Sequence, residues 1–358
     1  MSQSLSQVQG ATLPCTELYR SSLFIRYTKS LIFLSGSILV ISPQNRVLLL
    51  RRVQNSTSFP SAHVFPGGHV DLQDGALPPP SDFRCHEDSL PYRQAAIREC
   101  FEESGILLAH PENDTSSLIE MSDQVRHDGR KAVHAQETSF SDFLARLGAT
   151  TDISGLIPFT RWVTPSHLTK RYTTQMYLYF LPMKPSSLTT GFDKSQQFQI
   201  PTTDGGIEHN EARFLYPMEW IDLSLRREIT LFPPQFVLLS LIAQFLPSHD
   251  AQATSTLDFQ ALDQCRQKLK HWVTSSGDPP WSEKCISPGV INKVKNKYMI
   301  LGLGEPGPEL EGSMRKGDQQ WVLKVELDRA MEKGQTRPLP FELCKRSEFC
   351  REHENAKI

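Results

Sequence analysis

The sequence has 358 residues, of which 39% are hydrophobic and 22% are charged. This composition excludes a wholly disordered chain, and the length predicts about two domains. Lys and Arg (38) nearly balance Asp and Glu (40), and the resulting net charge of -2 argues against a chain-wide nucleic-acid surface.

Two further features bear on the compartment of the protein. The longest apolar run, Leu31–Ser42, is shorter than the roughly 20 residues of a membrane-spanning helix, so we expect no membrane span. Met1–Thr12 lacks a basic segment followed by an apolar one, and the seven Cys show no repeated spacing. The sequence therefore predicts reduced thiols and a cytosolic or organellar protein.

The amino-terminal part predicts strands followed by a loop. Ser30–Ser42 and Arg46–Val53 are apolar, β-branched runs joined by Pro43-Gln44-Asn45, which is typical of a hairpin. His63–Phe65 predicts a short strand. Leu72–Pro91 is polar and rich in Pro, which predicts an exposed loop.

The next element is a helix over Tyr92–Ser104. Ser89 is a suitable cap, Pro91 suits the first turn, and Gly105 suits the left-handed position that follows a helix. The helix is therefore bounded at both ends by local signals.

The remaining sequence alternates strands and helices. Apolar helices are expected at Pro234–Phe245 and Asp258–Val273, on either side of a polar linker. The expected strands are Gly155–Thr164, Thr173–Leu181, Glu211–Tyr216, Tyr298–Leu303 and Trp321–Leu327. The part after the linker is either a small second domain or an extension packed on the first.

Acidic side chains gather on the predicted helix. Glu99, Glu102 and Glu103 are spaced so that their carboxylates lie on one face, within about 6 Å of each other. Carboxylates held this close repel each other, and a divalent cation converts that repulsion into binding. Arg98 can hold one of them by paired hydrogen bonds. The alternative interpretation is a solvated acidic face.

The segment Arg98–Ile106 resembles the signature of the Nudix hydrolases: Gly, five residues, Glu, seven residues, then Arg-Glu, two residues, Glu-Glu, one residue, Gly and an apolar residue. Gly68 and Asp74 have the spacing of its first half, with Asp in place of Glu. Asp74 and Arg98 are separated by 23 residues where the signature has seven, which indicates an insertion of 16 residues.

Other motifs resemble one branch of that family, the peroxisomal coenzyme A diphosphatases of the nucleoside diphosphate-linked moiety X motif 19 type. They are the interrupted signature, Arg161-Trp162-Val163-Thr164-Pro165, Arg171–Tyr177 and Pro233-Pro234-Gln235-Phe236. The resemblance spans Lys29–Phe245. It implies hydrolysis of coenzyme A or acyl-CoA to 3',5'-ADP and (acyl-)4'-phosphopantetheine.

The resemblance also implies a fold class and a domain organisation. We expect an α+β fold, a Nudix α/β/α sandwich with a mixed β-sheet and a carboxyl-terminal extension. The expected boundaries are an amino-terminal extension at 1–28, a Nudix domain at 29–246 with an insertion at 72–91, a linker at 247–257, an α+β extension at 258–346 and an exposed tail at 347–358.

The family mechanism assigns roles to these residues. Mg²⁺ or Mn²⁺ would be held by Glu99, Glu102 and Glu103. The candidate catalytic residues are Glu103, Glu102, Arg98 and Glu211, with Glu208 as a neighbouring candidate. The candidate substrate-binding residues are Gly67, Gly68, Arg161 and Arg171.

The last three residues, Ala356-Lys357-Ile358, resemble the Ser-Lys-Leu peroxisomal address. They predict a peroxisomal import receptor as a partner and the peroxisome as the location, with the cytoplasm as the alternative.

Two alternative functions stay open. One is hydrolysis of another diphosphate, such as a nucleotide sugar, a dinucleotide or a prenyl diphosphate, because the signature recognises only the diphosphate. The other is a non-catalytic Nudix module that binds a nucleotide or a protein.

Overall fold

The computed structural model describes residues 32–54, 60–79, 82–183, 201–206, 208–247, 258–294, 297–310, 312–326 and 341–349. The predicted amino-terminal extension, nearly all of the linker and the tail from residue 350 onward lie outside the described residues.

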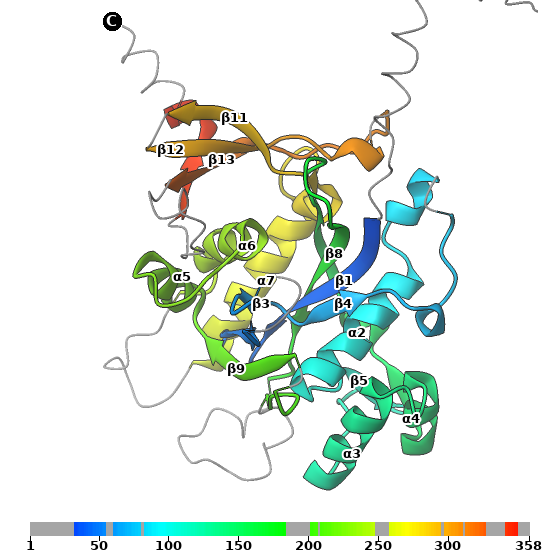
Figure 1. The fold of residues 1–358 in the computed structure, drawn as a ribbon. Helices are drawn as coiled ribbons and strands as arrows, with labels where there is room; N and C mark the ends of the chain where they lie inside the picture. Colours follow the sequence, from blue (N-terminus) through cyan, green and yellow to red (C-terminus); the bar gives the residue numbers. More distant parts are fainter. Residues whose placement is uncertain are drawn as a thin grey trace, which may run out of the picture.

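A mixed eight-stranded sheet forms the centre of the molecule (Figure 1). Its order is β10-β7-β8-β1-β2-β3, and β4 and β9 pair with β1 and β2, respectively. β1 and β8 run parallel, whereas β1 and β2 form the predicted hairpin. The strands are β1 (Ile32–Ile41), β2 (Val47–Arg52), β3 (His63–Val64), β4 (Gly67–His69), β7 (Ile157–Val163), β8 (Arg171–Phe180), β9 (His209–Leu215) and β10 (Cys285–Ile286).

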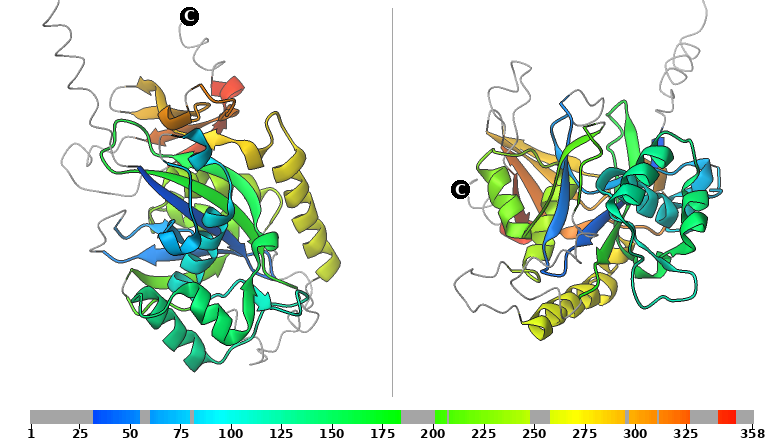
Figure 2. Two further views of the ribbon diagram at one scale, coloured as in Figure 1. Left: turned by 90° about the vertical axis from the view of Figure 1, so that its right-hand side faces the viewer. Right: turned by 90° about the horizontal axis from the view of Figure 1, so that it is seen from below.

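Helices cover both faces of this sheet (Figure 2). The central strand β1 is buried on both sides, so its apolar side chains alternate between two cores. Ile38 and Val40 pack toward the core that includes helix α2, and Leu39 and Ile41 pack toward the opposite one. The helices are α2 (Leu90–Ser104), α3 (Asp123–His134), α4 (Phe140–Leu147), α5 (Pro217–Leu225), α6 (Pro233–Ala243) and α7 (Phe259–Ser275). The predicted α+β fold with a mixed sheet is confirmed.

Helix α2 has the ends that its sequence predicts. Ser89 is its extended N-cap residue, Pro91 lies in the first turn, and Gly105 ends the helix with a left-handed φ of 75°. The helix lies close to β1 because Gly36 has no side chain: a Cβ there would be 2.6 Å from the Tyr92 carbonyl oxygen.

The prediction of an exposed loop at Leu72–Pro91 is wrong in part. This segment contains two 3-10 helices, η1 (Leu72–Asp74) and η2 (Phe83–His86). Asp74, Cys85 and His86 are buried. The Tyr92 hydroxyl donates a hydrogen bond of 2.5 Å to the Cys85 carbonyl, which ties the segment to α2.

The segment from residue 258 onward packs into the same core as the main sheet. Leu269 and Val273 of α7 are buried in that core, and β10 extends the edge of the sheet beside β7. A second, antiparallel sheet follows, and the Phe341 ring lies 5.4 Å from that of Phe236 in α6. Its strands are β11 (Gly289–Val294), β12 (Tyr298–Leu303), β13 (Asp318–Glu326) and β14 (Phe341–Lys345).

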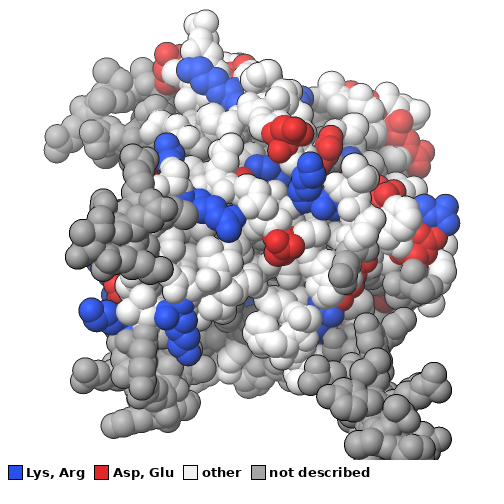
Figure 3. Space-filling model, turned by 90° about the horizontal axis from the view of Figure 1, so that it is seen from above, with Lys and Arg blue, Asp and Glu red and all other residues white. Residues whose placement is uncertain are grey.

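The remaining small elements are a two-stranded sheet of β5 (Ala109–Pro111) and β6 (Ala149–Thr151) and the 3-10 helices η3 (Ile153–Gly155), η6 (Trp281–Glu283) and η7 (Pro308–Leu310). Within the described ranges, no helix has the length and apolar character that crossing a bilayer requires. The face seen from above carries basic and acidic side chains interspersed (Figure 3).

Candidate active site

The carboxyl-terminal half of α2 lies against Gly67 and Gly68 of strand β4. The Gly67 amide donates a hydrogen bond of 2.8 Å to Glu103 Oε2. The Glu99 carboxylate packs so closely on Gly68 that a Cβ there would lie 2.3 Å from its carboxyl carbon. Because neither glycine has a side chain, the Glu99 and Glu103 carboxylates can lie against the backbone of β4.

Arg98 is the positioning residue of this region. Its Nε and Nη2 each donate a hydrogen bond of 2.9 Å to the Asp74 carboxylate. Its Nη1 donates to Glu99 and Glu102, also at 2.9 Å, and Nη2 reaches the His69 carbonyl at 2.8 Å. Asp74 thus anchors the arginine in spite of the long insertion, and Arg98, predicted as catalytic, fixes the orientation of other groups.

The predicted set of three metal ligands is not the set that the structure brings together. Arg98 Nη1 bonds one oxygen of both Glu99 and Glu102, and the other carboxylate oxygen of Glu102 faces His134 Nδ1 at 3.4 Å. Only Glu103 belongs to the cluster of metal-ligating side chains found among the described residues. Helical spacing places carboxylates on one face, but the arginine decides where their oxygens point.

That cluster consists of Glu103, Glu208 and His209. One ligand atom of each lies within 4.8 Å of the others. Glu208 lies just before β9, and its carboxylate is 3.4 Å from Arg52 Nη2. His209 begins β9, where it pairs in register with Arg52 of β2. The cluster therefore joins the end of α2 to the start of a distant strand.

Asp204 shapes the backbone that carries Glu208 and His209. Its carboxylate accepts hydrogen bonds from the Glu208 amide at 2.8 Å and from the His209 amide at 3.0 Å. Burial raises the pKa of Asp204, but the neighbouring His209 side chain and these two amides lower it below its usual value. Arg130 of α3 holds the same region to α2, because Nη2 donates to the Glu102 carbonyl and Nη1 to Thr202 Oγ1, at 2.9 and 2.7 Å.

Burial and mutual repulsion raise the pKa values of the acidic cluster. Burial, followed by the charges of Glu99 and Glu208, raises the pKa of Glu103 well above its usual range. Burial also raises the pKa of Glu99 to about 7, against the opposing effect of Arg98. Such a cluster is costly when it carries only negative charge, and hard divalent cations prefer oxygen ligands. The residues therefore fit a divalent cation.

The pH dependence of stability should reflect these shifts. A carboxyl group whose pKa is higher in the folded chain than in the unfolded chain makes a contribution to the free energy of unfolding that falls as pH rises. For Glu99 the window runs from 4.5 to about 7. In the presence of a chelator, we expect the melting temperature of Glu103→Gln to fall less steeply across this pH window than that of the wild-type protein. Added Mn²⁺ should restore the stability of the wild-type protein at pH 8. Equal slopes in the two proteins would contradict the shifts.

Gly68→Ala tests the contact between Gly68 of β4 and Glu99 of α2. The new Cβ would collide with the Glu99 carboxylate, so that side chain must move. Because small misplacements at a reacting centre are costly, we expect a loss of at least about tenfold in kcat/KM for diphosphate hydrolysis. Gly289→Ala is the control, since a Cβ there meets nothing within 4 Å. Equal activity of both variants would refute this role.

Glu211, which the sequence predicts as a catalytic residue, lies outside the cluster of Glu103, Glu208 and His209. Its carboxylate is 2.7 Å from Arg213 Nε and 3.8 Å from His63 Nε2. Residues 208 and 211 are both close to the start of β9, and the structure selects Glu208.

The two predicted phosphate-binding arginines have internal partners. Arg161 is 2% exposed, lies over the Tyr92 ring at 4.4 Å and donates to Thr173 Oγ1 at 3.2 Å. Arg171 forms a paired salt bridge with Glu309 and is 5% exposed. This burial argues against phosphate contacts by either side chain.

The sequence analysis overlooked His209. Its signal was its position directly after Glu208, before an apolar strand. A histidine in such a place is usually structural, and no local pattern tells that its ring will face a carboxylate on α2.

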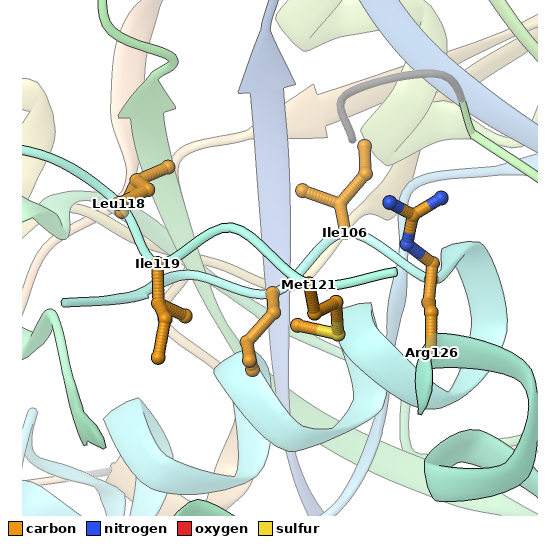
Figure 4. Close-up of a pocket in the computed structure, with 7 residues that line it drawn as sticks. Ile106, Leu118, Ile119, Met121 and Arg126 are labelled. Carbon is orange, nitrogen blue, oxygen red and sulfur yellow. The ribbon is translucent and has the colours of Figure 1, made fainter. Parts of the chain in front are cut away.

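A small hollow lies beyond the end of α2 (Figure 4). It is lined by Gly105, Ile106, Leu107, Leu118, Ile119, Met121 and Arg126. This described lining is mostly apolar and has no carboxylate, so we do not assign diphosphate chemistry to it.

The chain is similar to several known proteins. The sequence profile of the NUDT19 Nudix domain matches residues 81–242. Acyl-coenzyme A diphosphatase NUDT19 of Gallus gallus is 28% identical over 278 residues, which cover 64% of this chain and 69% of the relative. The protein of that name in Xenopus laevis is 27% identical, with coverage of 57% and 61%. The chain thus matches about three fifths of the length of the Xenopus relative.

Among solved structures, a NUDIX hydrolase from Alicyclobacillus acidocaldarius matches with a TM-score of 0.47 and 19% identity, over 60% of this chain and 91% of that one. The segment from Arg98 to Ile106 forms the end of α2 and lies within the profile match. From that motif and the profile match, the chain is similar to Nudix hydrolases of the NUDT19 type over residues 81–242.

Proposed function

We propose that this protein is a divalent-cation-dependent diphosphatase that hydrolyses coenzyme A or acyl-CoA to 3',5'-ADP and (acyl-)4'-phosphopantetheine. The cluster of Glu103 and Glu208, in which the Gly67 amide of β4 bonds Glu103, carries the proposal. The names of the curated relatives, acyl-coenzyme A diphosphatases, support the choice of substrate.

Glu103 and Glu208 would hold Mg²⁺ or Mn²⁺. When bound, the cation would offset the charge of the diphosphate and acidify a water molecule. Glu103 is fixed for this role because the Gly67 amide bonds its Oε2.

Glu99 would take the proton from the attacking water. Arg98 fixes its Oε1 at 2.9 Å. Arg98 and Asp74 would keep this carboxylate in place during the reaction.

The test is a panel of diphosphates incubated with the full chain and Mn²⁺ or Mg²⁺, with products identified by mass spectrometry. The panel includes coenzyme A, acyl-CoA esters, NADH, ADP-ribose and farnesyl diphosphate. We expect 3',5'-ADP from coenzyme A or acyl-CoA and no product with a chelator. If none of these compounds is hydrolysed, the proposal that this protein is a diphosphatase is wrong. A preference of more than about tenfold for another compound, or about 1.4 kcal/mol in barrier, would change only the substrate.

The proposed location is the peroxisome. It depends on Ala356-Lys357-Ile358, which lie outside the described residues. A fluorescent protein that carries the last residues of this chain should enter peroxisomes, and one that lacks the final three should stay in the cytoplasm.

A further inference from the structure

His209 is a buried polar side chain without a hydrogen-bond partner. It is 0% exposed, and neither ring nitrogen has a hydrogen bond within the described part of the chain. Leaving a buried polar group unsatisfied is unfavourable. Such a group calls for an explanation, and a missing ion is one of the usual ones.

The ring faces the acidic cluster. His209 Nδ1 lies 3.7 Å from Glu103 Oε1 and 3.6 Å from Asp204 Oδ2. Both distances are too long for a hydrogen bond. The distance to Glu103 lies between the roughly 3.0 Å that separates adjacent ligands and the roughly 4.2 Å that separates opposite ligands of an octahedral ion with bonds of about 2.1 Å.

The hydrogen bonds around the cluster leave Glu103 Oε1 and the His209 ring facing each other. Glu103 Oε2 is occupied by the Gly67 amide, so Oε1 is the oxygen that faces the imidazole. The backbone amides of Glu208 and His209 are bonded to Asp204, which holds the ring against the cluster.

His63 provides a contrast. It is also buried without a hydrogen-bond partner, and its Nε2 is 3.8 Å from Glu211. However, the charges that act on it come from Arg51 and Arg213, and it belongs to no cluster of metal-ligating residues among those described. Both histidines thus face a carboxylate, but among the described residues only His209 belongs to a cluster of potential metal ligands.

We propose that His209 supplies an imidazole nitrogen to the divalent cation held by Glu103 and Glu208. The inference rests on the proposed function, in which that cation is required. A ligand set that mixes nitrogen with oxygen favours Mn²⁺ over Mg²⁺, because Mg²⁺ prefers oxygen ligands and imidazole suits softer ions. His209 would thereby set the metal preference of the enzyme.

The test measures the bond itself. The full chain is loaded with one equivalent of Mn²⁺ and examined by electron spin echo envelope modulation. We expect modulation from a directly bound ¹⁴N nucleus, its replacement by a ¹⁵N signal when only the histidines are ¹⁵N-labelled, and its loss in His209→Gln. His63→Gln is the matched control and should retain the signal.

Metal titrations give a second readout. Because loss of even an outer partner of a metal site costs tenfold or more, we expect His209→Gln to weaken Mn²⁺ binding at least about tenfold. Mg²⁺ binding should weaken less than about threefold, since oxygen ligands dominate its affinity.

The outcomes separate the two proposals. Stoichiometric Mn²⁺ without nitrogen modulation in the wild-type protein would overturn the role of His209 and leave the proposed function standing. No Mn²⁺ binding to the wild-type protein would overturn both. The labelling experiment needs no substitution, so the absence of a histidine nitrogen signal would overturn the proposal even if His209→Gln folds poorly.

Discussion

Glu103→Gln is expected to lower kcat for coenzyme A hydrolysis about a thousandfold, which corresponds to about 4 kcal/mol in barrier. Glu103 lies in α2 and belongs to the cluster with Glu208 and His209. Its Oε2 accepts a hydrogen bond from the Gly67 amide of β4. The amide is almost the same size as the carboxylate but carries no charge to hold a cation. Steady-state product formation, measured with saturating Mn²⁺, checks the expectation.

Stability separates loss of chemistry from loss of folding in this variant. Removing one charge from a buried acidic cluster should leave the chelator-treated protein as stable as the wild type or more so, because burial and the neighbouring carboxylates disfavour that charge. Glu112→Gln, on the exposed turn after β5, is the control and should keep full activity. Glu103→Gln with more than a tenth of wild-type activity would exclude Glu103 as an essential ligand.

Arg98→Ala is expected to lower the free energy of unfolding by about 3–5 kcal/mol, because truncating one partner of a buried ion pair leaves uncompensated charge. The side chain of Arg98 is only 6% exposed and bonds Asp74, Glu99 and Glu102. Urea denaturation of the chelator-treated chain at pH 7 measures this loss.

Two comparisons sharpen the test of Arg98. Arg84→Ala removes an arginine from the inserted segment whose partner, Asp82, is part of an exposed pair, and it should not change the unfolding midpoint. Asp74→Asn keeps the size of the Asp74 side chain but weakens its hydrogen bonds to Arg98. Its loss in free energy of unfolding should therefore lie between those of Arg84→Ala and Arg98→Ala. A loss below about 1 kcal/mol in Arg98→Ala would mean that water screens the network, as at a surface pair.

Local sequence signals predicted the elements that need only neighbouring residues to form. Helix α2 was predicted from Pro91 and Gly105 at its ends, and it begins two residues before the expected start. The hairpin of β1 and β2 followed from two apolar runs and a turn. By contrast, α3, α4 and α5 were not predicted, and the inserted segment proved to contain buried residues.

The sequence by itself determined the family motif, the α2 helix and the acidic face, because residues three and four positions apart on a helix are always neighbours. Only the tertiary structure decided which acids meet. Asp74 reaches Arg98 across the insertion, and the pairing of β9 with β2 brings Glu208 and His209 to Glu103. Such contacts depend on strand register and burial over long separations in the chain, and no local spacing encodes them.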